Sequence, residues 1–199
     1  MTGEPLAVSA DVEEVLGRDL TPDEQKRVDS ILVKASELFR IASGQQFTPG
    51  ETTNRLKVTG NAVALLQRPV TEVVSVTTDS TTGQTLAFDL FQQELTIPQA
   101  CAGDFVRVTY RHGGEVPDLV RLTVAGVPAQ VFTTSKSAAA GVTQRSETKG
   151  PFTTQETYAA WALGAAPRLS PDDLAIAQSF RRARYGAILT GYDRPRQDC

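Results

Sequence analysis

The chain has 199 residues, of which 40% are hydrophobic and 22% are charged, and its formal net charge is −3. This composition is globular rather than disordered, and the length suits one domain with appendages or two very small ones. The net negative charge argues against a general nucleic-acid binder, because such proteins carry a basic excess. Two cysteines, one of them the last residue, argue against a disulfide scaffold. No apolar run approaches the ~18 residues of a membrane helix, and no signal peptide is visible, so we expect a protein made in the cytoplasm without a membrane partner.

Charge is unevenly distributed along the chain. Residues 1–40 contain nine acids and five bases, whereas residues 174–196 contain five arginines and a single acid, Asp193. An acidic beginning and a basic end favour contact with a partner, or head-to-tail contact between copies.

The N-terminal part reads as two helices. A short helix is expected over Ala10–Leu16, with Ser9 as its N-cap and Gly17 closing it. Thr21-Pro22-Asp23-Glu24 is a capping box with proline at the first helical position, and it predicts a longer helix over 22–42. Steps of three and four place its apolar residues on one face. These residues are Val28, Ile31, Leu32, Ala35, Leu38, Phe39 and Ala42.

A small antiparallel β unit is predicted for residues 56–110, after a polar loop at 45–55. A hairpin over 56–66 with its turn at residues 59–61 opens this unit. Further strands are expected at 70–77, 86–91, 95–97 and 105–110. The last strand alternates, with Val106, Val108 and Tyr110 on one face and Phe105, Arg107 and Thr109 on the other.

The C-terminal part is predicted to contain two helices separated by a long loop. The first helix runs from Pro117 to about residue 130, and Pro128 should kink or interrupt it. Residues 133–158 are rich in Ser, Thr, Gly and Ala, so we expect a long loop that is either mobile or paired with another copy, there as an extended strand or hairpin. Ser170 caps a final helix over 171–184, and a polar, basic tail follows.

The residues that usually carry catalysis are sparse and scattered. His112, the single histidine, is interpreted as a turn residue, and Cys101 as a small buried hydrophobe. Asp172-Asp173 stands in the first turn of a helix, where the helix dipole accounts for it. Phosphate-loop, dinucleotide and metal-ligand motifs are not found. The sequence therefore predicts a protein that is not an enzyme and that has no catalytic residue, cofactor or metal.

Several sequence segments, taken in chain order, resemble the segments of one protein family. They are the helix pair 9–16 and 22–42, then Leu65-Leu66-Gln67-Arg68-Pro69-Val70-Thr71-Glu72-Val73, then Val106–Tyr110 running into His112-Gly113-Gly114, then Val116-Pro117-Asp118-Leu119-Val120, then the Gly-rich 141–152 and the arginine-bearing 170–184. In this order the chain resembles the head-to-tail adaptors, or head–tail connector proteins, of long-tailed bacteriophages. It departs from them at Gly126-Val127-Pro128, which interrupts a helix that is usually continuous.

The resemblance implies a structural protein of the virion neck, assembled in the host cytoplasm. Such adaptors form a ring, commonly a dodecamer, under the capsid portal protein, and they bind the next neck or tail protein. DNA passes through the lumen during packaging and genome ejection without sequence readout. The implied fold is α+β: a helical bundle with a small antiparallel β insert, an extended loop and a C-terminal arm.

The corresponding organisation has four parts. These are an N-terminal helical part (1–55), an antiparallel β lobe (56–112), C-terminal helices with the long loop 133–158 (113–185), and a tail (186–199). The basic, aromatic tail is the candidate portal-binding arm. Its proposed contact residues are Arg181, Arg182, Arg184, Tyr185, Tyr192, Arg194 and Arg196.

Two other functions remain open from the sequence. Another neck ring protein, such as a stopper or tail terminator, is disfavoured by the long helix, because those proteins are mostly β-sandwiches. A DNA-packaging accessory module that binds DNA is suggested by the C-terminal arginines, but the overall charge opposes it.

Overall fold

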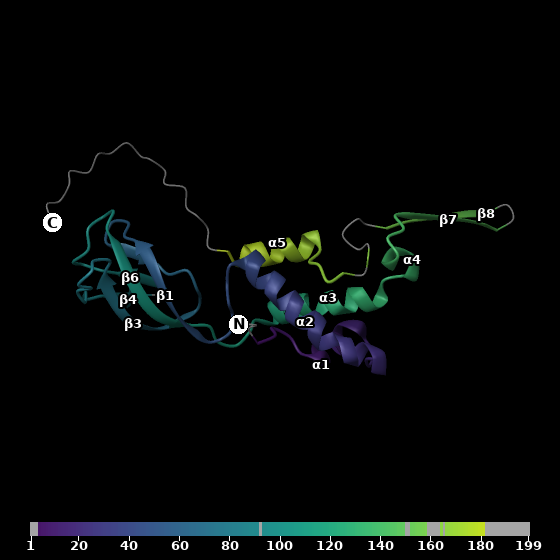
Figure 1. Cartoon of the computed structure of the whole chain (residues 1–199), viewed down its shortest axis with the longest axis horizontal. Helices are drawn as coiled ribbons and strands as arrows, with labels where there is room; N and C mark the ends of the chain where they lie inside the picture. The colour runs from purple at the N-terminus through teal and green to yellow at the C-terminus, as the bar shows by residue number, and fades with distance from the viewer. Residues whose placement is uncertain (1–3, 92, 150–151, 159–163, 165, 182–199) are drawn as a thin grey trace. The chain divides into compact units, whose positions relative to one another are not determined.

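The computed structural model describes residues 4–91, 93–149, 152–158, 164 and 166–181. Over this part of the chain the fold is mixed α and β, with five helices and three small antiparallel sheets (Figure 1). Two compact units share it, and each is treated separately below. The helical unit comprises Met1–Gly44 and Val116–Phe180, and the β unit comprises Gln45–Glu115.

The helical unit is built on α2 (Pro22–Ser43), which packs against α3 (Asp118–Thr133) and α5 (Pro171–Ser179). Helix α1 (Ser9–Leu16) packs mainly on α3. Six of the seven apolar residues expected to face inward from α2 are buried, and Leu38 is half-buried. The apolar periodicity therefore identified the buried face correctly.

The helix ends follow their local sequence. The side chain of Thr21 accepts a hydrogen bond from the Glu24 amide, as predicted, and Gly44 ends α2 in the left-handed conformation. Helix α1 begins one residue earlier than expected, because the Asp11 carboxylate accepts a 2.8 Å hydrogen bond from the Val8 amide. Val8 is therefore the N-cap, and Ser9 is the first helical residue.

Helix α3 runs through Pro128 instead of ending there. Proline removes one backbone donor from a helix interior, yet Val127 and Pro128 itself are both buried. Burial of this apolar turn offsets the lost hydrogen bond, and α3 reaches Thr133. The short helix α4 (Lys136–Ala139) follows.

The β unit contains two three-stranded antiparallel sheets. The first has the order β1-β6-β3, formed by β1 (Gly50–Lys57), β6 (Phe105–His112) and β3 (Val70–Thr78). The second has the order β2-β5-β4, formed by β2 (Ala62–Ala64), β5 (Glu94–Thr96) and β4 (Asp89–Phe91).

The pairing in the β unit corrects two sequence predictions. Residues 50–55 belong to strand β1 and are not loop, and β1 pairs with β6 over its whole length. The turn at Thr59–Ala62 exists, but β2 pairs with β5 and not with β1. Local pattern located the turn, whereas the choice of partner strand depends on contacts between distant residues.

The core of the β unit alternates as the sequence predicted for its last strand. Val106, Val108 and Tyr110 of β6 are buried together with Leu65, Leu95 and Ile97. The Tyr110 hydroxyl accepts hydrogen bonds from the Leu66 and Gln67 amides at 3.2 and 3.0 Å and donates to Asn54 Oδ1 at 2.9 Å. A buried tyrosine that satisfies two loop amides fixes this loop to the sheet.

Glycine is required at residue 113, where β6 ends. Gly113 has φ +87°, and a Cβ atom there would lie 2.2 Å from the Thr48 carbonyl oxygen. Both the dihedral and the close backbone approach exclude a side chain. The predicted Gly113-Gly114 strand end therefore has a steric cause.

Candidate interaction surfaces

The predicted portal-binding arm begins where the described structure ends. Ser170 Oγ accepts a 3.1 Å hydrogen bond from the Asp173 amide, which caps α5 as expected. Helix α5 is shorter than predicted, since it ends at Ser179, and Phe180 packs edge-on against Phe39 with ring centroids 6.3 Å apart. Arg181 is exposed directly after this contact. The other proposed contact residues, Arg182, Arg184, Tyr185, Tyr192, Arg194 and Arg196, lie outside the described residues.

The segment 133–158 contains secondary structure where a loop was predicted. Strands β7 (Gln144–Lys149) and β8 (Phe152–Thr157) form an antiparallel hairpin, and the Tyr158 amide donates to the Thr143 carbonyl at 3.0 Å. No third described strand pairs with either of them. The segment is therefore not a structureless loop in the single chain, because its polar composition hides a β-hairpin register with threonine on both strands. Its pairing with a neighbouring copy stays a prediction.

The described hairpin side chains are all exposed, from Gln144 to Ser146 and from Thr153 to Thr157. An isolated two-stranded hairpin is marginally stable in water, and its outer edges present unpaired backbone donors and acceptors. The hairpin is therefore an exposed element whose outer backbone edges pair with no other described strand.

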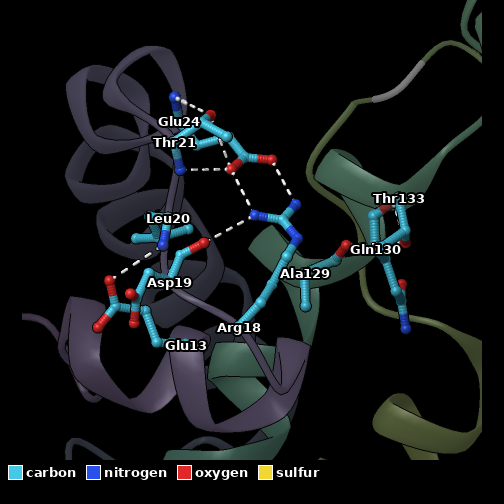
Figure 2. Close-up of polar contacts among 9 residues, drawn as sticks. All are labelled: Glu13, Arg18, Asp19, Leu20, Thr21, Glu24, Ala129, Gln130 and Thr133. Carbon is cyan, nitrogen blue, oxygen red and sulfur yellow. Dashed lines mark hydrogen bonds and ion pairs between the residues drawn. The ribbon is translucent and has the colours of Figure 1, made fainter.

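The helical unit is tied together by two ion-pair networks. Figure 2 shows the first, in which Arg18 binds both carboxylate oxygens of Glu24 at 2.8 and 2.9 Å and also donates to the Asp19 carbonyl. The hydrogen bond from Arg18 is the main reason that the pKa of Glu24 is lowered to about 2. The Glu13 carboxylate accepts from the Leu20 amide at 3.1 Å in the same view. The α1–α2 connection is thereby held in one conformation.

The last turn of α3 is also drawn in Figure 2, where the Thr133 hydroxyl donates to the Ala129 carbonyl at 2.8 Å.

The second ion-pair network of the helical unit joins α1 to α3. Arg121 of α3 is hydrogen-bonded to the buried carboxylate of Asp11 and lies 3.4 Å from Glu14. These contacts explain part of the acidic surplus near the N-terminus, since three of its acids accept from arginines within the subunit.

The β unit has an ion-pair cluster of its own around Asp79, which the sequence analysis did not predict. Asp79 accepts from Arg55 Nε at 2.5 Å and from Arg107 Nη2 at 3.2 Å. The two hydrogen bonds, that from Arg55 first, lower the pKa of Asp79 despite the opposing effect of its burial. Alternation along β6 placed Arg107 on the outer face, but Arg55 was assigned to a loop, so their pairing could not be inferred.

His112 and Cys101 lie in different settings from those expected. His112 is not a turn residue: it ends strand β6, is buried, and its Nε2 lies 2.8 Å from the Thr52 hydroxyl. Burial lowers the pKa of His112. Cys101 is half-buried, whereas a buried side chain was expected. The second cysteine, Cys199, lies outside the described residues.

Within the described ranges, no group of three or more His, Cys, Asp or Glu side chains is arranged to hold a metal ion. No helix in the same ranges is both long and apolar enough to cross a bilayer. Compared with known proteins, the chain matches no family model, and no curated protein matches it either.

Proposed function

We propose that this protein is a structural head-to-tail adaptor of a long-tailed bacteriophage, which assembles as a ring between the capsid portal and the neck or tail. In this proposal it is not an enzyme, its site is the virion neck, and DNA passes through the ring lumen. The proposed architecture is a helical bundle with a β insert, an extended loop carrying the hairpin, and a C-terminal arm over residues 181–199.

The observation that carries the proposal is the exposed β7–β8 hairpin. A chain of 199 residues can bury a core, and both compact units do so, yet the hairpin buries none of its described side chains. Ordering a strand costs backbone entropy that exposed polar side chains do not offset. Pairing with a neighbouring copy supplies the missing backbone hydrogen bonds, and repetition of that contact generates a ring when the rotation closes.

The helix content supports an adaptor over the alternative neck proteins. Helices form about 36% of the structure, and α2 has 22 residues. A β-sandwich stopper or tail terminator would contain little helix. A DNA-packaging accessory module remains the other alternative, and the net charge of −3 opposes tight DNA binding by the whole chain.

The oligomeric state of the protein tests the proposal, measured for the protein alone and in a mixture with portal particles from the same phage. Sedimentation and negative-stain images should show a ring whose axis coincides with that of the portal. Replacing residues 144–157 by a short Gly-Ser linker should leave a folded subunit that no longer forms rings. Removing residues 186–199 should leave ring formation intact and abolish co-sedimentation with the portal.

The hairpin replacement and the tail deletion serve as controls for each other. The first is expected to remove the contact between copies, and the second the contact with the portal. A wild-type chain that remains monomeric both alone and with portal particles would contradict the adaptor proposal. Ring formation by the chain without its hairpin would contradict the role of the hairpin.

A further inference from the structure

The basic residues of the β unit are concentrated on one surface. Residues 45–115 contain seven acids and five bases, so the unit is net negative. Four of the five bases lie at exposed positions on the same outer face of the β1-β6-β3 sheet. These four are Arg55, Lys57, Arg107 and Arg111, and the fifth is Arg68.

The two ends of this face differ in charge balance. At one end, Arg111 lies between two acids, with Glu51 at 3.3 Å and Glu72 at 2.7 Å. At the other end, Arg55 and Arg107 are direct partners in the β1–β6 register, and they share the single carboxylate of Asp79. The first end is net negative, and the second end is net positive.

The two arginines at this end repel each other across the strand pair. Like charges directly opposite each other on neighbouring strands destabilise a sheet, and one carboxylate neutralises only one of them. Lys57, the register partner of Phe105, adds a further positive charge beside them. An excess of cations held together against their repulsion is typical of a site for an anion.

The two guanidinium groups are held in place, but some of their N–H donors remain outside the contacts described here. The Arg55 guanidinium lies 3.8 Å from the centre of the Phe105 ring, and it donates to Asp79 through Nε. Arg107 donates through Nη2. Each group has five N–H donors, so several remain, and the two side chains are 55% and 60% exposed.

The cluster also borders a cavity of about 440 Å³ that Arg55, Asp79 and Phe105 line together with Ser80, Gln99 and Asp104. The two carboxylates in this lining keep the net positive charge small. An anion bound here is therefore held weakly.

We propose that Arg55, Lys57 and Arg107 form a low-affinity binding site for phosphate groups of the DNA backbone. Guanidinium groups bind phosphate oxygens through paired hydrogen bonds, and contacts of this kind carry no sequence information. The Arg55 guanidinium covers one face of the Phe105 ring, and Phe105 stays 40% exposed, so the arginine pair and Lys57 are the groups offered to a phosphate. An acidic protein segment is the alternative ligand, and the polyglutamate probe described below tests it.

This inference goes beyond the proposed adaptor function, in which DNA only passes through. The test measures binding of a fluorescent duplex DNA of random sequence to the full chain at increasing salt. Asp79 neutralises one of the three cations, so two phosphate contacts are expected. They predict a slope of about −1.8 in log K against log salt, or a roughly 12-fold loss of affinity between 50 and 200 mM.

Arg107→Gln should halve that slope and weaken binding several-fold at low salt. Arg68→Gln is the matched control, because it removes the same charge from the same unit at an exposed position outside the strands of this sheet. The C-terminal arginines are identical in all variants, so they cannot produce a difference between them. Circular dichroism should show equal folding of both variants.

Equal weakening by Arg68→Gln and Arg107→Gln would overturn the site, and so would wild-type affinity in Arg107→Gln. A polyglutamate peptide serves as the second probe. If it binds as tightly as the duplex and loses affinity equally in Arg107→Gln, the site recognises carboxylates, and the phosphate assignment is wrong. Ring formation, measured by sedimentation of the same variants, should not change, so this result is independent of the adaptor proposal.

Discussion

Helix α2 and the β7–β8 hairpin are both elements of regular structure, but they differ in what surrounds them. Helix α2 buries six apolar side chains against its own unit, and its two ends are capped. The described side chains of the hairpin are all exposed, and its strands pair only with each other among the described residues. The comparison teaches that regular backbone pairing can form with a buried apolar face, as in α2, or without any described buried side chain, as in the hairpin.

The largest expected effect is a loss of stability of the helical unit when a charge is placed in its buried core. Leu32 is 1% exposed in the core of the helical unit. Leu32→Asp places an unpaired carboxylate there, and the expected loss of stability is at least ~4 kcal/mol, enough to prevent folding of the unit. Circular dichroism of the purified variant checks this, with Lys34→Asp at an exposed position of α2 as the control. A soluble Leu32→Asp chain with full helix content would contradict the assignment of the buried face.

A smaller effect is expected in the β unit. Tyr110→Phe removes the hydroxyl that the Leu66 and Gln67 amides use, leaving both without this partner at a cost of about 1–3 kcal/mol. Hydrogen exchange at those two amides should accelerate, while amides of α2 keep their rates. Tyr158→Phe is the control, since its hydroxyl donates only to the exposed Glu156. Unchanged exchange at residues 66 and 67 in Tyr110→Phe would show that the loop is held by other contacts.

The pH dependence of the β unit should reflect His112. Because burial lowers its pKa below the ordinary 6.5, the unfolded chain binds the proton more readily than the folded chain. The stability contributed by neutral His112 is therefore present above pH 6.5 and is lost as pH falls through the lowered pKa of the folded state. Urea unfolding followed at residues of the β unit between pH 7.5 and 5 measures this. His112→Gln should flatten the dependence, and an identical slope in both proteins would exclude His112 as its source.

The smallest effect on the isolated subunit is expected at the hairpin. Gln155→Pro removes a strand donor in β8, but the hairpin adds no described side chain to either core, so the loss of stability should stay below ~0.5 kcal/mol. Ring assembly should be lost in the same variant, and Gln155→Thr should keep both properties. Urea unfolding of the monomer and sedimentation of the assembly check the two parts. A loss of monomer stability of more than ~1 kcal/mol would show that the hairpin is already supported within the subunit.

The sequence by itself determined the elements whose causes are local. The capping box at Thr21, the apolar spacing of α2, the alternation of β6 and the Ser170 cap each involve residues within a few positions of one another. Such signals set both the existence and the buried face of an element.

Only the tertiary structure decided the features that depend on distant residues. It paired β1 with β6, carried α3 through Pro128, buried His112 beside Thr52, and brought Arg55 and Arg107 to the same carboxylate. Each of these depends on which segments meet after a long loop has closed, and no short pattern specifies that choice. The exposed hairpin illustrates the same limit, because its polar composition predicts a loop, and the backbone register alone makes it a sheet.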